Sequence, residues 1–401
     1  MEPHHQASWP TDSVAADLVD AENDARTPAT DVDGVEDTSG AGEESITNPW
    51  DPTKSKFETR PYTVDLLLRR VDHGEIDLEP DFQRKAGLWS GEQKSRLIES
   101  LLVRIPLPAF YFDATNESKW LVVDGLQRLT VFREFVRGDM RLERLEFLSS
   151  YEKLRFDELP RDLRRRIEET QVVVHLIQPG TPPEVKFNIF RRINTGGLVL
   201  TGQEIRHALF QGRSTRLLNE LAQSSSFKRA TAGSIKPDRM VDREFVLRFL
   251  AFMSRPYTEY RVPDMDAFLN GQMAAINKME DAAISDLSIR FNRAMDAAHR
   301  IFGEHTFRKL YVRNQFRMPI NKALFEVWSV CLGRLEPSDL DFLVEHREDL
   351  ISGAMRALND RPFETAVSVG TQDVKKVHLR FATVAAVVRE VLNPSQGGLA
   401  V

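Results

Sequence analysis

The chain has 401 residues, of which 41% are hydrophobic and 28% are charged, and it contains one cysteine, Cys331. That length suggests two or more domains. A single cysteine excludes a disulfide within the chain and fits a reducing cytoplasm. No apolar run approaches the roughly 18 residues of a membrane-spanning helix, and the N-terminus lacks the basic start and apolar core of a secretory signal. We therefore expect a cytoplasmic protein without a membrane partner.

Charge is distributed unevenly along the chain. Residues 1–48 hold 12 acidic residues and one arginine, a net charge of −11, whereas residues 49–401 hold 48 acidic and 53 basic side chains, a net charge of +5. A segment with so few large apolar residues cannot bury enough surface to offset its ordering entropy. Residues 1–48 are therefore predicted to be a disordered acidic leader. The mildly basic remainder permits a nucleic-acid partner without requiring one.

The first predicted elements are helices with recognisable N-caps. Thr63 caps a short helix that ends near Val71, and residues 76–80 are predicted to be extended because of their alternating pattern and a proline. Ser90 and Gln93 have the spacing of a capping box, which opens a helix running through Val103.

Strands and helices then alternate. Residues 109–112 and 120–123 predict a β-hairpin, and the β-branched run at residues 171–177 predicts a buried strand. A helix is predicted from the prolines at 182–183 until the Asn-Thr-Gly-Gly sequence at 194–197, and another begins with a second capping box at residues 201–204.

From about residue 215 onward the pattern is helical almost without interruption. Apolar residues recur with a 3.6-residue period, and strand patterns are nearly absent. The sequence thus predicts an α+β protein in which a mixed domain with a small sheet precedes an all-α domain. The predicted divisions are the leader at 1–48, the mixed domain at 49–225, the α-helical domain at 226–393 and a flexible tail at 394–401.

Residues 120–136 combine a short apolar strand, an Asp124-Gly125 turn and an amphipathic helix. A strand that leads directly into a helix presents free backbone N–H groups and the positive end of the helix dipole, which suits a phosphate or another anion. Gln127 and Arg128, in the first helical turn, would add an amide and a guanidinium group. The same spacing also fits a purely structural capping box between Asp124 and Gln127.

Three segments occur together in a specific order: Pro80-Asp-Phe-Gln83-Arg84, then Asp124-Gly125-Leu126-Gln127-Arg128, then Phe190-Arg-Arg-Ile-Asn194-Thr-Gly. With this order and spacing, residues 55–225 resemble the N-terminal domain family of the GmrSD-type, modification-dependent restriction enzymes. The resemblance implies a fold related to ParB and sulfiredoxin, in which a small mixed sheet is wrapped by helices. It also implies a restriction-like, phage-defence role.

The resemblance further implies that the Asp-Gly-x-Gln-Arg loop binds a nucleotide or a DNA phosphate, and that nucleoside-triphosphate hydrolysis regulates DNA cleavage. Candidate catalytic residues are Asp124, Gln127 and Arg128, and candidate nucleotide- or phosphate-binding residues are Gln83, Arg84, Gly125, Arg128 and Asn194. The arginines could stabilise charge on a transferring phosphoryl group, while Asp124 could hold Mg²⁺ or orient a water. The expected cofactor is a nucleoside triphosphate with Mg²⁺, and no resident metal is predicted.

Some of these residues also have structural interpretations. Arg84 could pair with Asp81 or Glu79, and Asn194 could be a left-handed helix cap. The family's loop has glutamine where this chain has Leu126, which could weaken a ligand contact.

Several other chemistries find no matching pattern. There is no Walker-type Gly-x-x-x-x-Gly-Lys-Ser/Thr loop. His299 and His305 are close in sequence but lack the surroundings of an HNH nuclease, so DNA cutting would require the N-terminal domain or a separate nuclease partner. Two hypotheses remain: a nucleotide-hydrolysing factor of a DNA-processing or defence system, and a non-catalytic module that binds DNA or a partner through the same phosphate pocket. A nicking nuclease acting alone ranks last, because no dense carboxylate cluster is present.

Overall fold

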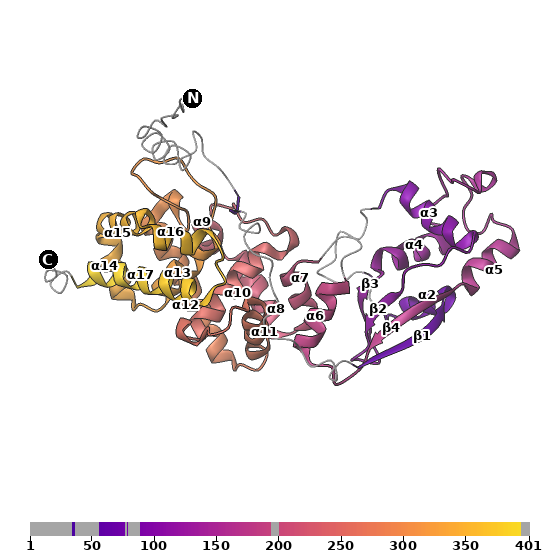
Figure 1. Ribbon diagram of the computed structural model, residues 1–401, viewed down its shortest axis with the longest axis horizontal. Coiled ribbons are helices and arrows are strands. Elements are labelled where there is room, and N and C mark those ends of the chain that lie inside the picture. Colours follow the sequence, from indigo (N-terminus) through magenta and orange to yellow (C-terminus); the bar gives the residue numbers. More distant parts are fainter. Residues whose placement is uncertain (1–33, 37–55, 77, 79–88, 194–199, 394–401) are drawn as a thin grey trace, which may run out of the picture.

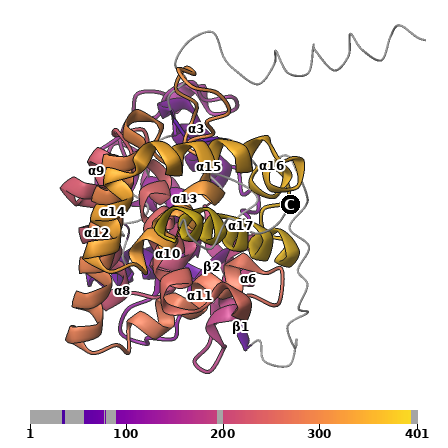
Figure 2. The same ribbon diagram turned by 90° about the vertical axis from the view of Figure 1, so that its left-hand side faces the viewer.

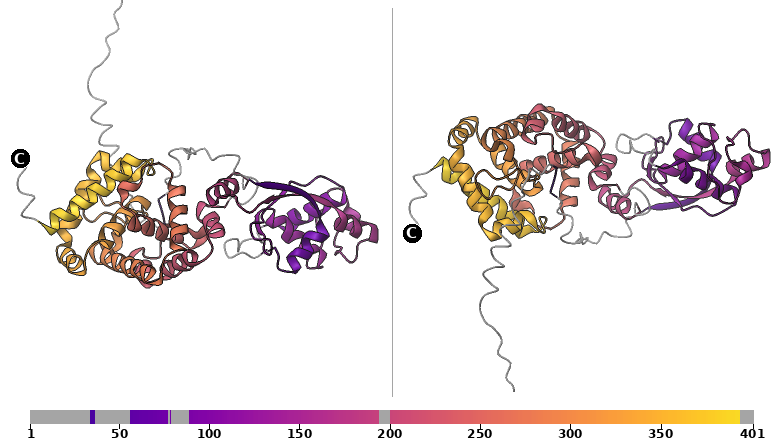
Figure 3. Two further views of the ribbon diagram at one scale, coloured as in Figure 1. Left: turned by 90° about the horizontal axis from the view of Figure 1, so that it is seen from below. Right: turned by 90° about the horizontal axis from the view of Figure 1, so that it is seen from above.

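The computed structural model describes residues 34–36, 56–76, 78, 89–193 and 200–393. Within them the predicted α+β class is confirmed, because a four-stranded sheet with its helices is followed by an almost wholly helical region. The two parts lie side by side along the longest axis of the molecule, with helices α6 and α7 between them (Figures 1 and 3).

The sheet has the strand order β1-β4-β2-β3. β2 and β3 form the predicted antiparallel hairpin, β2 runs parallel to β4, and β1 runs antiparallel to β4. The predicted strand at residues 171–177 is confirmed, and it occupies a central position. The strands are β1 (Phe57–Thr63), β2 (Phe110–Asp113), β3 (Leu121–Asp124) and β4 (Gln171–Ile177).

The edge strand β1 was not predicted. Its sequence contains charged residues and Pro61, which lacks a backbone N–H and is tolerated only at a sheet edge or bulge. All seven of its residues nevertheless pair with β4, from Phe57 opposite Ile177 to Thr63 opposite Gln171. Tertiary pairing with a strand more than 100 residues away therefore creates this element, since its own pattern does not indicate a strand.

Four helices cover one face of the sheet: α2 (Val64–Asp72), α3 (Gly91–Leu102), α4 (Leu126–Val136) and α5 (Arg161–Glu169). The cap at Thr63 and the capping box of Ser90 with Gln93 are confirmed. Apolar side chains of these helices form one buried cluster with the sheet residues Phe110, Phe112 and Val174.

The opposite face of the sheet packs against α6 (Pro183–Ile193) and α7 (Gly202–Leu209). The alternation of side chains along a strand explains this division, because Val122 joins the first cluster and its neighbour Val123 joins the second. The predicted helix at Pro183 and the capping box of Thr201 with Glu204 are both confirmed. The sheet is therefore the middle layer of three.

The remaining helices lie packed together (Figure 2). Their apolar side chains share one large core. Within the region predicted to be helical from about residue 215 onward, residues 265–302 form two helices that separate near Asn277. Short 3₁₀ turns lie at Ser149–Tyr151, Asp238–Met240, Tyr257–Glu259 and Gly303–His305. The helices are α8 (Arg213–Gln223), α9 (Ser225–Ala230), α10 (Val241–Ser254), α11 (Met265–Ile276), α12 (Asp281–Phe302), α13 (Lys322–Gly333), α14 (Pro337–Glu345), α15 (Arg347–Asn359), α16 (Arg361–Ser368) and α17 (Val374–Leu392).

A buried charge network ties three helices of this core together. The Glu326 carboxylate on α13 is 1% exposed and accepts hydrogen bonds from Arg248 on α10 and Arg380 on α17. Nearby cations, chiefly Lys322 and Arg248, outweigh the effect of burial and lower the pKa of Glu244. Ion pairing rather than solvent thus keeps these buried groups charged.

Ion pairs also join the sheet-bearing part to the helical part. Asp266 on α11 accepts from Arg206 on α7 at 2.6 Å and from Arg191 on α6 at 3.1 Å. Glu204 on α7 binds Arg239, with the closest contact at 2.9 Å. Arg206 is only 2% exposed, so α7 is fixed by buried charge as well as by apolar packing.

The acidic leader departs from its prediction at one place. Most of residues 1–48 lie outside the described residues, but Gly34, Val35 and Glu36 are bound to the helical part through a bridge to Ile320. A contact with a partner far along the chain orders this short segment, and composition alone gives no indication of it. None of the helices in the described parts of the chain combines the length and apolar character that crossing a membrane requires.

Candidate functional site

The strand–turn–helix arrangement around Gly125 is confirmed. β3 ends at Asp124, Gly125 has a positive φ of 102°, and α4 starts at Leu126. A Cβ atom at Gly125 would lie 2.3 Å from Cδ1 of Phe110. The position requires glycine for two reasons: its backbone is left-handed, and an aromatic ring of β2 lies directly against it.

The interpretation of Asp124 and Gln127 as a capping box is wrong. Gly125 is the N-cap residue of α4, and no side chain makes a capping hydrogen bond there. The Asp124 carboxylate instead accepts a hydrogen bond from Arg128, at 2.9 Å between Oδ2 and Nη2. The tight turn at Gly125 thus directs Asp124 toward a guanidinium group instead of the helix N–H groups.

Arg128 is held in a buried, well-satisfied position. It is 8% exposed, donates to the carbonyls of Pro108 and Ala109, the latter at 3.0 Å, and lies with its guanidinium carbon 4.3 Å from the centre of the Phe110 ring. Burial lowers the pKa of Arg128, while the Asp124 carboxylate opposes that shift. These contacts fasten the start of α4 to the start of β2.

The motif therefore separates into supporting and exposed positions. Gly125 and Arg128 pack around Phe110, and Leu126 is 8% exposed within the apolar cluster of the sheet. The side chain at position 126 faces the core, so Leu126 makes an apolar contact at a buried position. Gln127 is partly exposed, and no hydrogen bond of its amide occurs within the part of the chain that the structure describes.

Asp124 retains some access to solvent. Its side chain is 35% exposed, and its ion pair with Arg128 uses one of the two carboxylate oxygens. Asp124 and Gln127 thus form the accessible part of the turn. The structure brings together four predicted residues, Asp124, Gly125, Gln127 and Arg128; the others, Gln83, Arg84 and Asn194, lie outside the described residues.

The described residues do not form a Mg²⁺ site by themselves. Among them, no group of three or more histidine, cysteine, aspartate or glutamate side chains is arranged to hold a metal ion. Asp124 supplies a single carboxylate, and Arg128 already neutralises it. His305 lies 3.7 Å from Glu304, and His299 is on the exposed side of α12.

A buried ion pair on the α6 side of the sheet was not found in the sequence. Lys186 donates from Nζ to Oδ2 of Asp113 at 2.8 Å and to the hydroxyl of Thr115, and both charged side chains are about 90% buried. The sequence contains one indication of this pair, because the acidic Asp113 directly follows the apolar strand predicted at residues 109–112. No residue near Asp113 in the sequence indicated Lys186 as its partner. All of these groups satisfy one another, so the pair fixes α6 against the end of β2.

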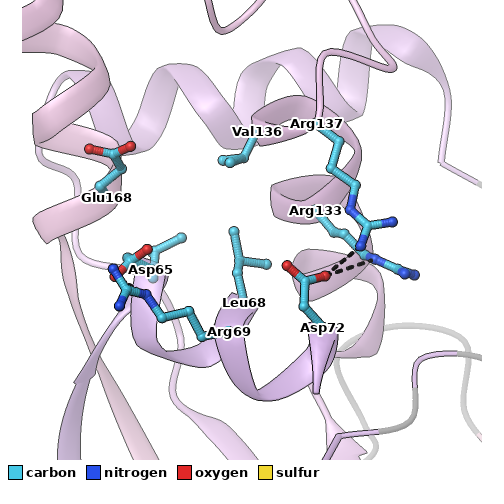
Figure 4. A pocket seen from close by; sticks show the side chains of 9 residues that line it. Asp65, Leu68, Arg69, Asp72, Arg133, Val136, Arg137 and Glu168 are labelled. Atoms are coloured by element: carbon cyan, nitrogen blue, oxygen red, sulfur yellow. Dashed lines mark hydrogen bonds and ion pairs between the residues drawn. The ribbon is translucent and has the colours of Figure 1, made fainter. Parts of the chain in front are cut away.

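A separate pocket lies between α2, α4 and α5, near the C-terminal end of α4 (Figure 4). Its apolar floor includes Leu68 and Val136. Asp72 pairs at 2.5 Å with Arg137, and Asp65 pairs at 2.9 Å with Arg69. Acidic and basic groups around this pocket largely neutralise one another, so it shows no preference for an anion. Because Gly125 is at the other end of α4, the pocket is distinct from the motif turn.

Comparison with known proteins identifies the sheet-bearing part. Residues 66–211 match the family described as the GmrSD restriction endonuclease, N-terminal domain. The matched segment begins in α2 and extends just past α7, and it includes the Asp124–Arg128 turn. No curated protein and no solved structure gives a significant match.

The family match indicates a component of a restriction-like phage-defence system. Residues 66–211, which supply three of the four strands and helices on both faces of the sheet, are a domain of the GmrSD restriction endonuclease N-terminal family.

Proposed function

We propose that the chain is a nucleotide-responsive component of a restriction-like defence system. Its sheet domain binds the phosphate of a nucleoside triphosphate at the start of α4, and hydrolysis there controls the DNA-processing activity of the assembly. The observation that carries the proposal is that one turn contains both buried and accessible positions. Gly125 and Arg128 pack against Phe110, whereas Gln127 and part of Asp124 remain accessible.

The backbone geometry supports an anionic ligand. Gly125 caps α4 without a side-chain hydrogen bond, so no cap side chain from the described part of the chain satisfies the N–H groups of the first turn. Such groups and the helix dipole favour phosphate. The Gln127 amide is beside them and can donate to a phosphate oxygen or orient a water molecule.

Arg128 is assigned a positioning role in this proposal. Its guanidinium is directed at Pro108, Ala109 and Asp124 rather than outward. It holds the turn in shape and orients the Asp124 carboxylate. Mg²⁺, which would neutralise the phosphates when bound with the nucleotide, would need ligands beyond Asp124. The proposal includes Gln83, Arg84 and Asn194 as further ligand-binding residues.

The alternative is a binding module without turnover that holds a DNA phosphate at the same turn. Among the described residues of the turn, Asp124 and Gln127 are the two partly exposed polar side chains, which favours it, because a hydrolytic site usually needs more groups around the reacting phosphate. The proposed partners are therefore a nucleotide, DNA and a separate nuclease protein that would perform the cutting.

Binding and turnover are tested together on the full chain. Isothermal titration with each common nucleoside triphosphate and Mg²⁺ measures affinity, and phosphate release with and without duplex DNA measures hydrolysis. The expected result is binding of at least one triphosphate, weakened roughly 10- to 150-fold by Gln127→Ala, since one hydrogen bond to a charged group contributes about 1.5–3 kcal/mol. The same substitution should leave thermal unfolding unchanged.

Gln223→Ala is the matched control, because Gln223 is an exposed glutamine on α8 in the helical part. Asp124→Ala and Arg128→Ala complete the series. Phosphate release that survives the Asp124, Gln127 and Arg128 substitutions would refute hydrolysis at this turn. DNA binding that depends on Gln127, without any triphosphate binding, would establish the non-catalytic alternative.

A further inference from the structure

A short segment of the acidic leader occupies a built site on the helical part of the protein. Val35 pairs with Ile320 as a parallel β-bridge: the Ile320 N–H donates to the Gly34 carbonyl at 2.9 Å, and the Glu36 N–H donates to the Ile320 carbonyl at 2.8 Å. Ile320 also bridges Arg308 on its other side. The leader segment thus adds a third extended piece to a pair already present, which is the mode of peptide binding by β-augmentation.

Side chains at the site hold the Glu36 carboxylate at both oxygens. Lys309 Nζ donates to Oε1 at 2.7 Å, and Asn321 Nδ2 donates to Oε2 at 2.7 Å. Lys309 is 6% exposed and Asn321 is 0% exposed. Buried donors of this kind satisfy a carboxylate strongly, because hydrogen bonds to a charged group are worth more than neutral ones.

The site is fixed independently of its occupant. Asn321 caps α13 by accepting the Leu324 N–H at 2.8 Å, and its amide also donates to the Val367 carbonyl at 2.8 Å. Lys309 donates to Ser368 at 2.7 Å and lies 3.7 Å from the Glu364 carboxylate. Removing Glu36 therefore leaves both donors with other partners.

The occupant has a simple sequence requirement. Gly34 has a positive φ of 104°, Val35 packs against the large helical core, and Glu36 supplies the carboxylate. We propose that Lys309, Ile320 and Asn321 form a peptide-binding site for an extended glycine–apolar–glutamate segment, and that Gly34–Glu36 of the same chain is its resident ligand. This interaction is separate from the nucleotide site proposed above.

Docking gives the chain a second connection between its two parts. Glu36 is bound to the helical core, residues 37–55 lead from it to β1 of the sheet domain, and the chain returns to the helical part after α7. The leader segment is thus an internal strap. A tethered ligand competes at an effective concentration near the millimolar range, so an untethered peptide of the same sequence binds weakly until the resident segment is removed.

The first measurement is hydrogen exchange of the Ile320 amide in the full chain, because that N–H donates to Gly34. Glu36→Lys reverses the charge that faces Lys309 and should release the segment, so exchange at Ile320 should accelerate at least tenfold. Asp31→Lys makes the same change of charge in the leader and should leave the exchange rate as in the wild type. Equal exchange in all three proteins would show that the leader is not docked.

The second measurement uses a fluorescein-labelled peptide of residues 30–40 and fluorescence anisotropy. The peptide should bind the Glu36→Lys protein at least tenfold more tightly than the wild type, whose site is occupied. A peptide carrying Glu36→Gln, or a protein that also carries Lys309→Met, should bind at least tenfold more weakly. Equal binding to both proteins, or no binding to either, would overturn the proposal. A wild-type dimer that Glu36→Lys dissociates would show docking between chains, which also contradicts it.

Discussion

Gly125→Ala should destabilise the sheet domain through two separable effects. An alanine at φ 102° costs about 1–2 kcal/mol, because its Cβ crowds the backbone in the left-handed region. The same Cβ would lie 2.3 Å from the Phe110 ring, and forcing an atom into a packed core costs a further 1–3 kcal/mol or so. We expect a total of about 2–5 kcal/mol.

A double variant separates these effects. Phe110→Ala alone should cost about 3–5 kcal/mol, since Phe110 is fully buried. In that background the ring is absent, so Gly125→Ala should cost only the conformational 1–2 kcal/mol or so. Hydrogen exchange of the β3 amides is a suitable assay because it reports the free energy of opening of this region, whereas a chain with two separate cores has no single unfolding free energy.

The reasoning fails if Gly125→Ala costs the same in both backgrounds, because the ring contact would then contribute nothing. It also fails if alanine at 125 is tolerated without loss. The first result would leave the left-handed backbone as the reason for glycine, and the second would remove both structural reasons.

Three further predictions concern buried polar groups. Glu326→Gln should destabilise the helical core by about 3–5 kcal/mol in urea unfolding, because it leaves the buried Arg380 without its counter-ion and leaves Arg248 with Glu244 alone; an unchanged midpoint would contradict this. Burial would raise the pKa of Glu99, but hydrogen bonds from three successive N–H groups, at residues 146–148, hold that pKa below its usual value. The resulting stability is present above the unfolded-state pKa of about 4.3 and is lost as pH falls through the folded-state pKa. Exchange at residues 146–148, corrected for intrinsic rates, should therefore accelerate in acid in the wild type, and Glu99→Gln should remove that pH dependence. Burial raises the pKa of Cys331 to about 12, so a thiol reagent at pH 8 should modify it only after denaturation, and rapid labelling of the native protein would refute that.

Elements with strong local signals were predictable. The capping boxes that open α3 and α7 and the β2–β3 hairpin all occur where their sequences indicate them. In each, neighbouring residues satisfy the backbone groups, so little information from distant parts of the chain is needed. β1 was not predictable in this way, because its strand conformation depends on pairing with the distant strand β4.

The candidate site was only partly predictable for the same reason. The sequence identified the Asp124–Arg128 turn, but the capping interpretation of Asp124 was wrong because the true competitor for its carboxylate, Arg128, is held in place by Pro108 and Ala109. Those carbonyls are about 20 residues earlier in the chain. Without the contact between Arg128 and these carbonyls, no local pattern could show that Asp124 forms an ion pair and not a helix cap.

By itself the sequence determined the capped helix starts at Ser90 and Thr201, the α+β class and the motif turn, because short-range hydrogen bonds and hydrophobic periodicity control them. The tertiary structure decided which polar groups are buried together: Glu36 with Lys309, Asp113 with Lys186, and Glu326 with two arginines. Such pairs join residues from about 50 to 270 positions apart. Desolvation penalises a charge that lacks its partner, and only the folded chain brings the partners together.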